Sequence, residues 1–438
     1  MNLLWLIFVA ALLATSFVDA QDLQGVEILK VIEKYNNPSE VLTFKGHQVL
    51  TVNVRNKNEL KQLSRIVEKY YLDTWTELKV GNVDIRVPPE FKDAVRKAIV
   101  SPTVVKIADL EQTIINSKKE PEMQIQSTAV QEIPNIDFFK DYHTYDELSS
   151  FVRKLNKDHP NITELVSAGK TYEGRDMFGL RIKGKNAKKK FVFHGGIHAR
   201  EWISPATVTY ITNALVGLYE KDQKIKNIVD NYDIYVVPIM NADGYVFTQQ
   251  NRMWRKNRQP NRGSNCIGTD LNRNWNHPSW SGPGASSNPC NELYYGSSAA
   301  STTEVKNMAK FIAAAKPDVY IDFHSYGQQW MWAYAYKCNG APPNINRVAA
   351  AGKAGVNALK AVHNTVYEYG PLCTTLYQAS GASVDWANDV AKIPYSYTIE
   401  LRDTGRNGFV LPRGQIIPSG EETLAGVIAL LEHVLNNS

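Results

Sequence analysis

Hydrophobic positions in the first quarter of the chain switch between the period of a strand and the period of a helix. Four apolar or alternating runs have strand character, at residues 47–54, 73–77, 83–87 and 103–107. Two patterns with helical spacing lie among them, at 60–70 and 91–98. The order β-α-β-β-α-β predicts a small α+β domain of the ferredoxin-like, open-sandwich type. This segment offers no obvious catalytic chemistry.

The longer C-terminal part alternates apolar strand-like runs with helical patterns. Continuous apolar runs occur at 189–196, 232–241, 318–325 and 395–403, and an amphipathic helical pattern extends from Glu421 to Leu435. Strands of this kind separated by helices predict an α/β layered domain. Functional residues in such domains gather where strands end. The ends of these runs are therefore the expected location of a functional site.

Two segments flank the first predicted domain. The stretch 1–20 has an apolar run from Leu3 to about Ala14 and then small residues, which predicts a secretory signal peptide cleaved after Ala20, although it lacks a Lys or Arg near its start. A membrane anchor is the alternative, but the run is shorter than the roughly 20 residues that span a bilayer. Residues 116–134 are polar, contain two prolines and lack a clear period. They are expected to form an exposed linker.

The head of this linker carries a dibasic pair, Lys118 and Lys119. A trypsin-like protease could cut after Lys119, because Pro121 does not directly follow it. The next basic residue, Lys140, already lies inside the second predicted domain. The alternative is that the two lysines only form a solvated turn.

Composition and charge exclude some partners. The chain has 438 residues, of which 43% are hydrophobic and 21% charged, so it is long enough for more than one globular domain. Its 49 Lys and Arg residues against 44 Asp and Glu residues give a net charge of +5. This excess is too small to indicate nucleic acid or an anionic membrane as a partner.

Export would place the cysteines in an oxidising compartment, which favours disulfide bonds. Three pairings are open to the four cysteines, which are Cys266, Cys290, Cys338 and Cys373. None of them belongs to a CxxC motif or a Cys/His cluster. The sequon that begins at Asn161 is a candidate glycosylation site, although short sequons also occur by chance.

The stretch HGGIHAREW at 194–202 concentrates charge at the end of one apolar run. Gly195 and Gly196 let the backbone turn sharply after the strand. Ser204 followed by Pro205 predicts a helix N-cap and a proline at the first helical position. The charged residues are thus expected on a strand-to-helix turn, which can direct several side chains at one point.

Three residues at the predicted strand ends have the chemistry of metal ligands. His198 and Glu201 lie three positions apart on the turn, and His324 ends another apolar strand. A catalytic zinc takes three protein ligands of these types and keeps one position open for water. The HxxE spacing alone occurs by chance in many chains, so the alternative is an ordinary polar turn without metal.

Further polar residues lie near this candidate metal site in the sequence pattern. Glu400 lies within an apolar strand, where a lone carboxylate is costly unless it is paired or used. Asn272 and Arg273 are in a loop-like segment, where an arginine can bind a carboxylate with two hydrogen bonds. The alternative for Arg273, as for Arg255, is a surface salt bridge.

These features resemble the secreted zinc metallocarboxypeptidases of the pancreatic and insect digestive type, in their proenzyme form. The motifs that carry the resemblance run in family order and are GGIHAREWISPAT, NRMWRKNR, DLNRNW, DFHSYGQ, LYQASGASVDW and YTIELRDTGRNGFVLP. The resemblance implies a three-layer α/β/α catalytic domain around a mixed twisted sheet, preceded by the ferredoxin-like propeptide. The implied boundaries are 1–20 for the signal peptide, 21–119 for the activation propeptide, with a linker to about 134, and 120–438 for the catalytic domain.

Transferred residue by residue, the resemblance implies a catalytic apparatus. One Zn²⁺ per chain would be held by His198, Glu201 and His324. Asp270 would orient His198. Glu400 would be the general base and acid, and Arg255 would stabilise the oxyanion.

The resemblance also implies how substrate is bound. Asn272, Arg273 and Tyr377 would hold the terminal carboxylate of a peptide or protein. Arg200 and Tyr326 would line the subsites on the acyl side. The disulfides would pair Cys266 with Cys290 and Cys338 with Cys373.

The base of the specificity pocket is implied to be Val384. An aspartate there would attract Lys or Arg, so valine predicts a preference for aromatic or aliphatic C-terminal residues. Asp385 says nothing about specificity, because the family has an aspartate there in all classes. Ala382 replaces a glycine often seen in this loop and adds a methyl group near the pocket.

The complete prediction is a secreted exopeptidase, kept inactive by its own propeptide and activated by a trypsin-like protease. The resemblance further implies a monomer that serves digestive proteolysis in a gut lumen. Two alternatives remain: a binding protein of this fold that has lost catalysis, and a deacylase of small amides. Against them, the metal-ligand, general-base and carboxylate-binding positions all carry the expected residues.

Overall fold

The computed structural model describes residue 28, residues 30–119 and residues 133–437. The predicted signal peptide at 1–20 and the greater part of the predicted linker lie outside these residues.

The first domain is a four-stranded antiparallel sheet with two helices on one face. Its strands, in the sheet order β2-β3-β1-β4, are β2 (Asp73–Thr74), β3 (Gly81–Val87), β1 (Gln48–Val54) and β4 (Thr103–Ile107). The helices are α3 (Lys57–Tyr70) and α4 (Lys92–Ala98). Asn56 caps α3 by accepting hydrogen bonds from two backbone amides of its first turn. The order β-α-β-β-α-β confirms the prediction of an open sandwich.

The larger domain is built on an eight-stranded mixed sheet. Its strands, from one edge to the other, are β11 (Glu368–Pro371), β10 (Gln329–Trp332), β12 (Tyr395–Leu401), β9 (Val319–Ser325), β7 (Lys189–His194), β8 (Tyr232–Val237), β6 (Asp176–Ile182) and β5 (Thr163–Lys170). The four central strands β12, β9, β7 and β8 are mutually parallel. Their side chains are buried almost without exception, because helices cover both faces of the sheet.

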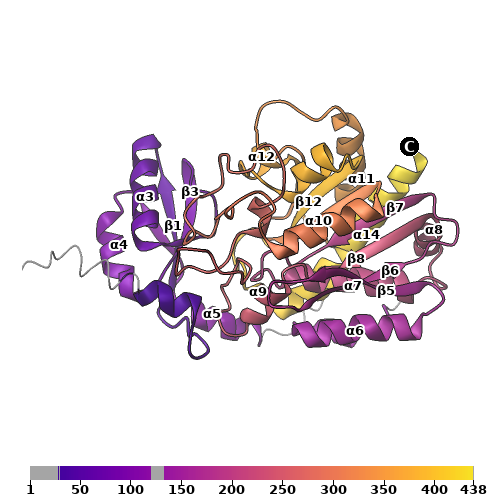
Figure 1. Ribbon diagram of the computed structural model, residues 1–438, viewed down its shortest axis with the longest axis horizontal. Coiled ribbons are helices and arrows are strands. Elements are labelled where there is room, and N and C mark those ends of the chain that lie inside the picture. The colour runs from indigo at the N-terminus through magenta and orange to yellow at the C-terminus, as the bar shows by residue number, and fades with distance from the viewer. Residues whose placement is uncertain (1–27, 29, 120–132, 438) are drawn as a thin grey trace, which may run out of the picture.

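Helices enclose the sheet from both sides. One face is covered by α6 (Tyr145–Asp158), α7 (Ile203–Gly217), α8 (Gln223–Asn231), α11 (Ile345–His363) and α14 (Ile416–Asn436). The other face is covered mainly by α10 (Thr303–Ala315) and a short helical segment at 383–390. Shorter helices are α9 (Ala242–Phe247), α12 (Leu372–Thr375) and α13 (Ser383–Asp385). The three layers confirm the predicted α/β/α domain (Figure 1).

The predicted start of α7 is wrong, because the helix begins earlier in the chain. The helix begins at Ile203 with Trp202 as N-cap, so Ser204 and Pro205 lie inside its first turn. The Ser204 hydroxyl does not cap the helix. It donates to the carbonyl of Phe323 (2.6 Å) and accepts from the backbone N–H of Gly196 (3.0 Å). Ser204 therefore ties the glycine turn after β7 to the neighbouring strand β9.

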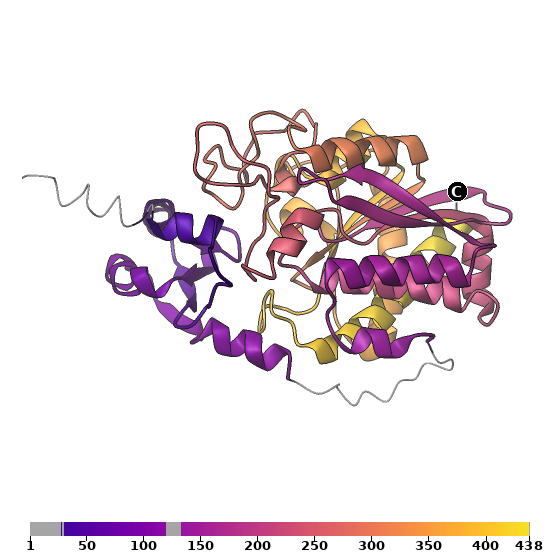
Figure 2. The same cartoon turned by 60° about the horizontal axis from the view of Figure 1, so that its bottom comes forward.

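The two domains meet along a shared apolar seam. Trp75 of the first domain packs edge-on against Phe409 of the larger one, with ring centroids 5.2 Å apart. A buried cluster joins Phe44, Val49, Trp75, Ile107 and Leu110 of the first domain to Met253, Phe409 and Val410 of the second. After β4, α5 (Leu110–Ser117) leaves the first domain toward the larger one (Figure 2). The seam places the first domain over loops of the larger domain near the ends of its central strands.

Candidate active site

Three potential metal ligands meet at the carboxyl ends of the central strands. His198 and Glu201 follow β7, and His324 is in β9, the strand next to it. His198 Nδ1 lies 2.8 Å from Glu201 Oε1 and 3.1 Å from His324 Nδ1. His324 Nδ1 lies 3.1 Å from Glu201 Oε2, and all three side chains are buried. The structure thus brings together the three residues predicted to bind metal.

The opposite ring nitrogens of both histidines contact carboxylates. His198 Nε2 lies 3.1 Å from Asp270 Oδ1, and His324 Nε2 lies 2.9 Å from Asp322 Oδ2. An ionised carboxylate only accepts hydrogen bonds, so each Nε2 carries the proton. Each Nδ1 then presents a lone pair to the shared point between the rings. This arrangement is the one in which a histidine binds a metal ion with an oriented ring.

The charges around this point suit a divalent cation. Four buried carboxyl groups surround it, those of Glu201, Asp270, Asp322 and Glu400. Two guanidinium groups, from Arg255 and Arg273, are also buried there. The excess of acid and the two converging imidazole lone pairs are the donor chemistry of a zinc site with three protein ligands. The residues therefore fit the predicted metal.

A tight backbone turn directs the ligands. Gly196 has φ of +62°, and a Cβ there would approach Ile239 Cα to 3.3 Å. Any other residue would be strained in this left-handed conformation. A methyl group on Gly195 would meet the Ser204 hydroxyl oxygen at 2.5 Å. Both glycines are thus needed for β7 to turn into α7 with His198 and Glu201 on the inner side.

Glu400 lies beside the ligand cluster with an unused oxygen. In the parallel pairing of β12 and β9, Glu400 is opposite His324. Its Oε2 is buried without a hydrogen-bond partner among the described residues. Burial raises the pKa of Glu400 to about 8, against the opposing effect of His324. A carboxyl group whose pKa lies near neutral pH can accept and return a proton.

Arg255 is fixed next to the same point. Its Nη2 donates to Asp270 Oδ2 (2.8 Å), and its Nε donates to the same oxygen (3.2 Å). Its Nη1 lies 3.9 Å from Glu201 Oε1. Asp270 therefore orients both His198 and Arg255, and the guanidinium group has a fixed position at the edge of the metal cluster.

Arg273 offers an unpaired donor for an anionic group. Its Nε and Nη1 donate to the carbonyls of Gly284 (2.7 Å) and Asn272 (2.9 Å). Its Nη2 is buried and has no partner among the described residues. The ring of half-buried Tyr377 lies 5.7 Å from the guanidinium carbon. The structure thus groups Arg273 and Tyr377 as predicted.

Asn272 has a second task that the sequence did not reveal. Its Oδ1 accepts from the backbone N–H of Ser383 (2.8 Å). Its Nδ2 lies 3.3 Å from His324 Nε2, which already carries a proton toward Asp322. Since two donors cannot share a hydrogen bond, the Asn272 amide hydrogens stay available to another acceptor.

The predicted specificity residue lies in an apolar cluster. Val384 is fully buried, at 0% exposure. It belongs to a buried cluster with Met331, Ala335, Leu372, Ala379 and Ala382, against which Leu376 and Tyr377 pack. Thr398, on the neighbouring strand β12, has a buried hydroxyl without a partner among the described residues.

Arg200 is engaged by the first domain. Its Nη1 lies 2.9 and 2.8 Å from the two carboxylate oxygens of Asp73, and both side chains are almost fully buried. Its guanidinium carbon lies 4.0 Å above the ring of Phe409. Tyr326, the other predicted subsite residue, packs its ring 5.0 Å from Phe409, and its buried hydroxyl has no hydrogen-bond partner among the described residues. The first domain therefore covers both predicted acyl-side residues.

Sequence reasoning did not assign two charged residues of this region. Asp73 lies in the first domain, which had no obvious chemistry, and its contact with Arg200 depends on how the domains pack. Asp322 could have been noticed, because it lies two positions before His324 on one strand and therefore on the same face. A buried acid in an apolar strand was the signal that identified Glu400, and it applies equally to Asp322.

The cysteines form two disulfides, Cys266–Cys290 and Cys338–Cys373. This is the pairing that the family resemblance implied. The second bridge anchors α12, which leads directly into the segment that carries Tyr377.

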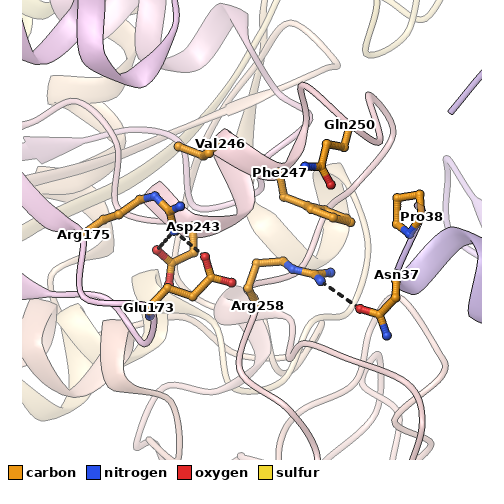
Figure 3. Close-up of a pocket in the computed structure, with 9 residues that line it drawn as sticks. All are labelled: Asn37, Pro38, Glu173, Arg175, Asp243, Val246, Phe247, Gln250 and Arg258. Carbon is orange, nitrogen blue, oxygen red and sulfur yellow. Dashed lines mark hydrogen bonds and ion pairs between the residues drawn. The ribbon is translucent and has the colours of Figure 1, made fainter. Parts of the chain in front are cut away.

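A separate cavity of about 310 Å³ lies at the seam between the domains (Figure 3). Asn37 and Pro38 form one wall, and Arg258 reaches toward them, donating from Nη1 to the carbonyl of Asn36 (3.1 Å). The opposite wall pairs Arg175 with Asp243 (2.9 Å). Its charged groups largely satisfy each other, and none of its lining residues belongs to the metal cluster.

Comparisons with known proteins agree with this geometry. Residues 148–426 match the family described as zinc carboxypeptidase, and residues 50–117 match the carboxypeptidase activation peptide. A metallocarboxypeptidase A from Arthroderma otae is 42% identical over 403 residues, covering 90% of this chain and 94% of the relative. Carboxypeptidase A2 of Mus musculus is 37% identical over 398 residues, with the same coverage.

Solved structures give the same result. Thrombin-activatable fibrinolysis inhibitor superposes with a TM-score of 0.80 at 30% identity, covering 90% of this chain and 100% of that one. Carboxypeptidase A from Helicoverpa armigera superposes with a TM-score of 0.77 at 26% identity, covering 90% and 99%. No helix in the described part of the chain is long and apolar enough to cross a bilayer. With zinc as the cofactor that fits the buried cluster, the chain belongs to the zinc carboxypeptidase family and is a metallocarboxypeptidase proenzyme that carries the activation peptide.

Proposed function

We propose that the activated protein hydrolyses the C-terminal peptide bond of peptides and proteins and prefers aromatic or aliphatic C-terminal residues. The main support for this proposal is the grouping of the metal ligands with Glu400 and Arg273. The converging ligands His198, Glu201 and His324 lie beside Glu400 Oε2, and Arg273 Nη2 is nearby. In the described part of the chain, neither of these two atoms has a hydrogen-bond partner. These are the groups needed to activate water and to bind a free C-terminus.

Zinc and Glu400 would have different roles in the hydrolysis. Zinc held by the three ligands would polarise the scissile carbonyl and lower the pKa of water. Glu400 would take the proton from the attacking water at Oε2 and return it to the leaving amine. Its raised pKa supports both roles, because the group can exist in either protonation state near neutral pH.

Arg255 and Arg273 would bind the two oxyanionic groups of the reaction. Arg255 is held by Asp270 at the edge of the metal cluster, where it would stabilise the oxyanion of the tetrahedral intermediate. Arg273, with Asn272 and Tyr377, would hold the terminal carboxylate of the substrate. Arg273 Nη2, which has no partner within the described ranges, and the available amide hydrogens of Asn272 support this assignment.

The apolar cluster around Val384 would receive the terminal side chain. Burying a Lys or Arg side chain among these residues would leave a charge without a partner, which is strongly unfavourable. An aromatic or aliphatic side chain gains roughly 25 cal/mol for each Å² of apolar surface removed from water. Ala382 narrows the pocket by one methyl group compared with a glycine. Arg200 and Tyr326 would contact the acyl side of the substrate.

The activation peptide would keep the enzyme inactive by covering this cleft. The buried pair between Asp73 and Arg200 occupies a predicted subsite residue, and Trp75 packs on Phe409 next to Tyr326. Lys118 and Lys119 are exposed immediately after α5, which supports a cut there by a trypsin-like protease. Removal of the peptide would expose Arg200 to substrate.

We further propose that the protein is secreted and acts as a monomer. Two disulfides support an oxidising compartment. Asn161 is exposed and Thr163 is buried, so the sequon presents its asparagine to solvent. The digestive role, the gut lumen and the boundaries of the signal peptide and propeptide stay predictions.

The assay that tests this proposal compares matched peptides ending in Phe and in Lys. The trypsin-treated protein is expected to release Phe much faster than Lys and to lose activity with a zinc chelator. Protein carrying Glu400→Gln, treated in the same way, is the control for contaminating peptidases. Preferential release of Lys would refute the assigned specificity, and chelator-resistant activity would refute the metal mechanism. Hydrolysis of small acyl-amides without a free carboxylate, in preference to peptides, would favour the deacylase alternative.

A further inference from the structure

A chain of buried polar groups continues behind the metal ligand His324. Asp322 lies two residues earlier on β9, and its Oδ2 is 2.9 Å from His324 Nε2. The same oxygen accepts a hydrogen bond from the Ser383 hydroxyl (2.6 Å). Neither Asp322 nor Ser383 is accessible to solvent. A carboxylate buried so deeply requires donors that compensate its charge, and these two contacts supply them.

The other Asp322 oxygen faces a second histidine that is not a candidate metal ligand. His194 Nδ1 is 3.5 Å from Asp322 Oδ1, and both atoms are buried without a hydrogen-bond partner among the described residues. His194 Nε2 lies 2.7 Å from the hydroxyl of Tyr320. Burial holds the pKa of the Tyr320 hydroxyl well above its usual range, so this hydroxyl keeps its proton and can donate it.

These contacts define one consistent set of proton positions. The Tyr320 hydroxyl donates to His194 Nε2, which leaves the proton of His194 on Nδ1, directed at Asp322. The Asp322 carboxylate also accepts from His324 Nε2. His324 Nδ1 is then the unprotonated nitrogen, and this is the atom that faces His198 and Glu201. Each contact in the chain therefore supports the tautomer of His324 that binds metal.

We propose that Asp322 is a positioning residue that fixes the ring and tautomer of His324 for zinc, and that His194 in turn holds Asp322. This inference rests on the proposed assignment of His198, Glu201 and His324 as the zinc ligands. Asp270 has the equivalent position behind His198. Both imidazole ligands are thus oriented by carboxylates, and partners of this kind contribute roughly 10- to 100-fold to metal affinity.

The test measures the zinc affinity of the full-length apoprotein by competition with a chromophoric chelator. Asp322→Asn and Asp322→Ala are expected to weaken zinc binding by roughly tenfold or more. His194→Asn is expected to weaken it less, because this residue acts through Asp322. The absorption spectrum of the Co²⁺-substituted protein is the second readout. It should change in the Asp322 variants, since the orientation of a ligand ring alters the coordination geometry.

Asp233→Asn is the matched control. Asp233 is also a buried, paired aspartate on a central strand, but its partner is Arg181 (2.8 Å). It lies near the start of β8, whereas the metal ligands lie at the carboxyl ends of the central strands. This variant should keep the wild-type zinc affinity and Co²⁺ spectrum. Circular dichroism of each apoprotein checks folding. If Asp322→Ala does not fold, the nearly isosteric Asp322→Asn decides the question.

The outcomes separate this inference from the proposed function. Wild-type protein that binds no zinc, or binds it equally well with His324→Ala, would refute the proposed ligand set. Wild-type protein that binds zinc normally, with folded Asp322 variants of unchanged affinity and spectrum, would refute the positioning role alone. Unchanged affinity in His194→Asn together with a loss in Asp322→Asn would remove His194 from the inference and leave Asp322.

Discussion

The contact between Asp73 and Arg200 yields a quantitative prediction about latency. In the uncut proenzyme, the side chains of this pair are 3% and 1% exposed. The same carboxylate accepts from Arg86 Nε (3.0 Å) and from the indole N–H of Trp75 (3.1 Å). Asp73→Ala would leave Arg200 buried under the activation peptide without a counter-charge. This unfavourable state exists only while the peptide covers the cleft.

The expected magnitude follows from the burial of the pair. Removing one partner of a buried ion pair destabilises the covered state by roughly 3–5 kcal/mol. At about 1.4 kcal/mol for each factor of ten, the lower limit corresponds to a shift on the order of 100-fold toward the open form. The uncut Asp73→Ala proenzyme should therefore hydrolyse a small Phe-ending substrate at least about 100 times faster than the uncut wild type.

The assay is steady-state hydrolysis before and after trypsin treatment, with mass spectrometry to verify that the chain is intact in the first case. After cleavage, variant and wild type should have the same activity, because Asp73 leaves with the peptide. Glu59→Gln is the control, since Glu59 is bonded within the first domain to Arg55 and Ser101. Uncut Asp73→Ala activity within about threefold of wild type, or an equal increase in Glu59→Gln, would show that the Asp73–Arg200 pair does not maintain latency.

Other predictions concern pH, the base, the pocket and the metal. Burial alone would raise the pKa of Asp73, but Arg200 and Arg86 outweigh it and lower the pKa from 3.8 to about 2. The pair therefore supports latency fully above about pH 4 and loses its effect as the pH falls toward about 2. The uncut proenzyme is exposed to a series of acid pH values, and its hydrolysis of a peptide substrate is then measured at neutral pH. This assay will show whether latency weakens between about pH 4 and pH 2 rather than near neutral pH. Glu400→Gln should lower kcat by roughly 10²- to 10⁴-fold with little change in KM, measured on the activated enzyme, and an unchanged kcat would exclude it as the base. Val384→Asp should lower kcat/KM for Phe-ending peptides and raise it for Lys-ending peptides, because it places a carboxylate in the pocket; unchanged selectivity would contradict the assignment of the pocket. Chelation should abolish activity and added Zn²⁺ should restore it without a refolding step, because the ligand side chains are held by contacts of their own.

Much of the architecture could be predicted from the spacing of the apolar residues and from the lengths of the apolar runs. The strands with strict alternation or continuous apolar residues, such as β1 and β9, were predicted to within a few residues. Their burial on one or both faces fixes the pattern in the sequence. The start of α7 could not be predicted in this way. Ser204 looked like a helix cap, but its hydroxyl serves a tertiary contact between Gly196 and Phe323 that local sequence does not show.

The site residues also differ in whether the local sequence alone shows their role. His198, Glu201 and His324 could be proposed because residue type and position at strand ends carry chemical meaning without knowledge of the fold. The roles of Asp73 and Asp322 could not, because each depends on a partner far along the chain or in another domain. Asn272 is intermediate. Its residue type indicated polar recognition, but its bond to Ser383 appears only in the folded site.

The proposed mechanism requires a single zinc ion held by His198 Nδ1, His324 Nδ1 and the carboxylate of Glu201. Anomalous diffraction at the zinc edge, from crystals of the trypsin-activated enzyme, will locate this ion. We expect one strong peak per chain at that point, with Glu400 and Arg255 beside it. A peak bound through the Nε2 atoms, a peak elsewhere, or none in crystals grown with zinc would contradict the account.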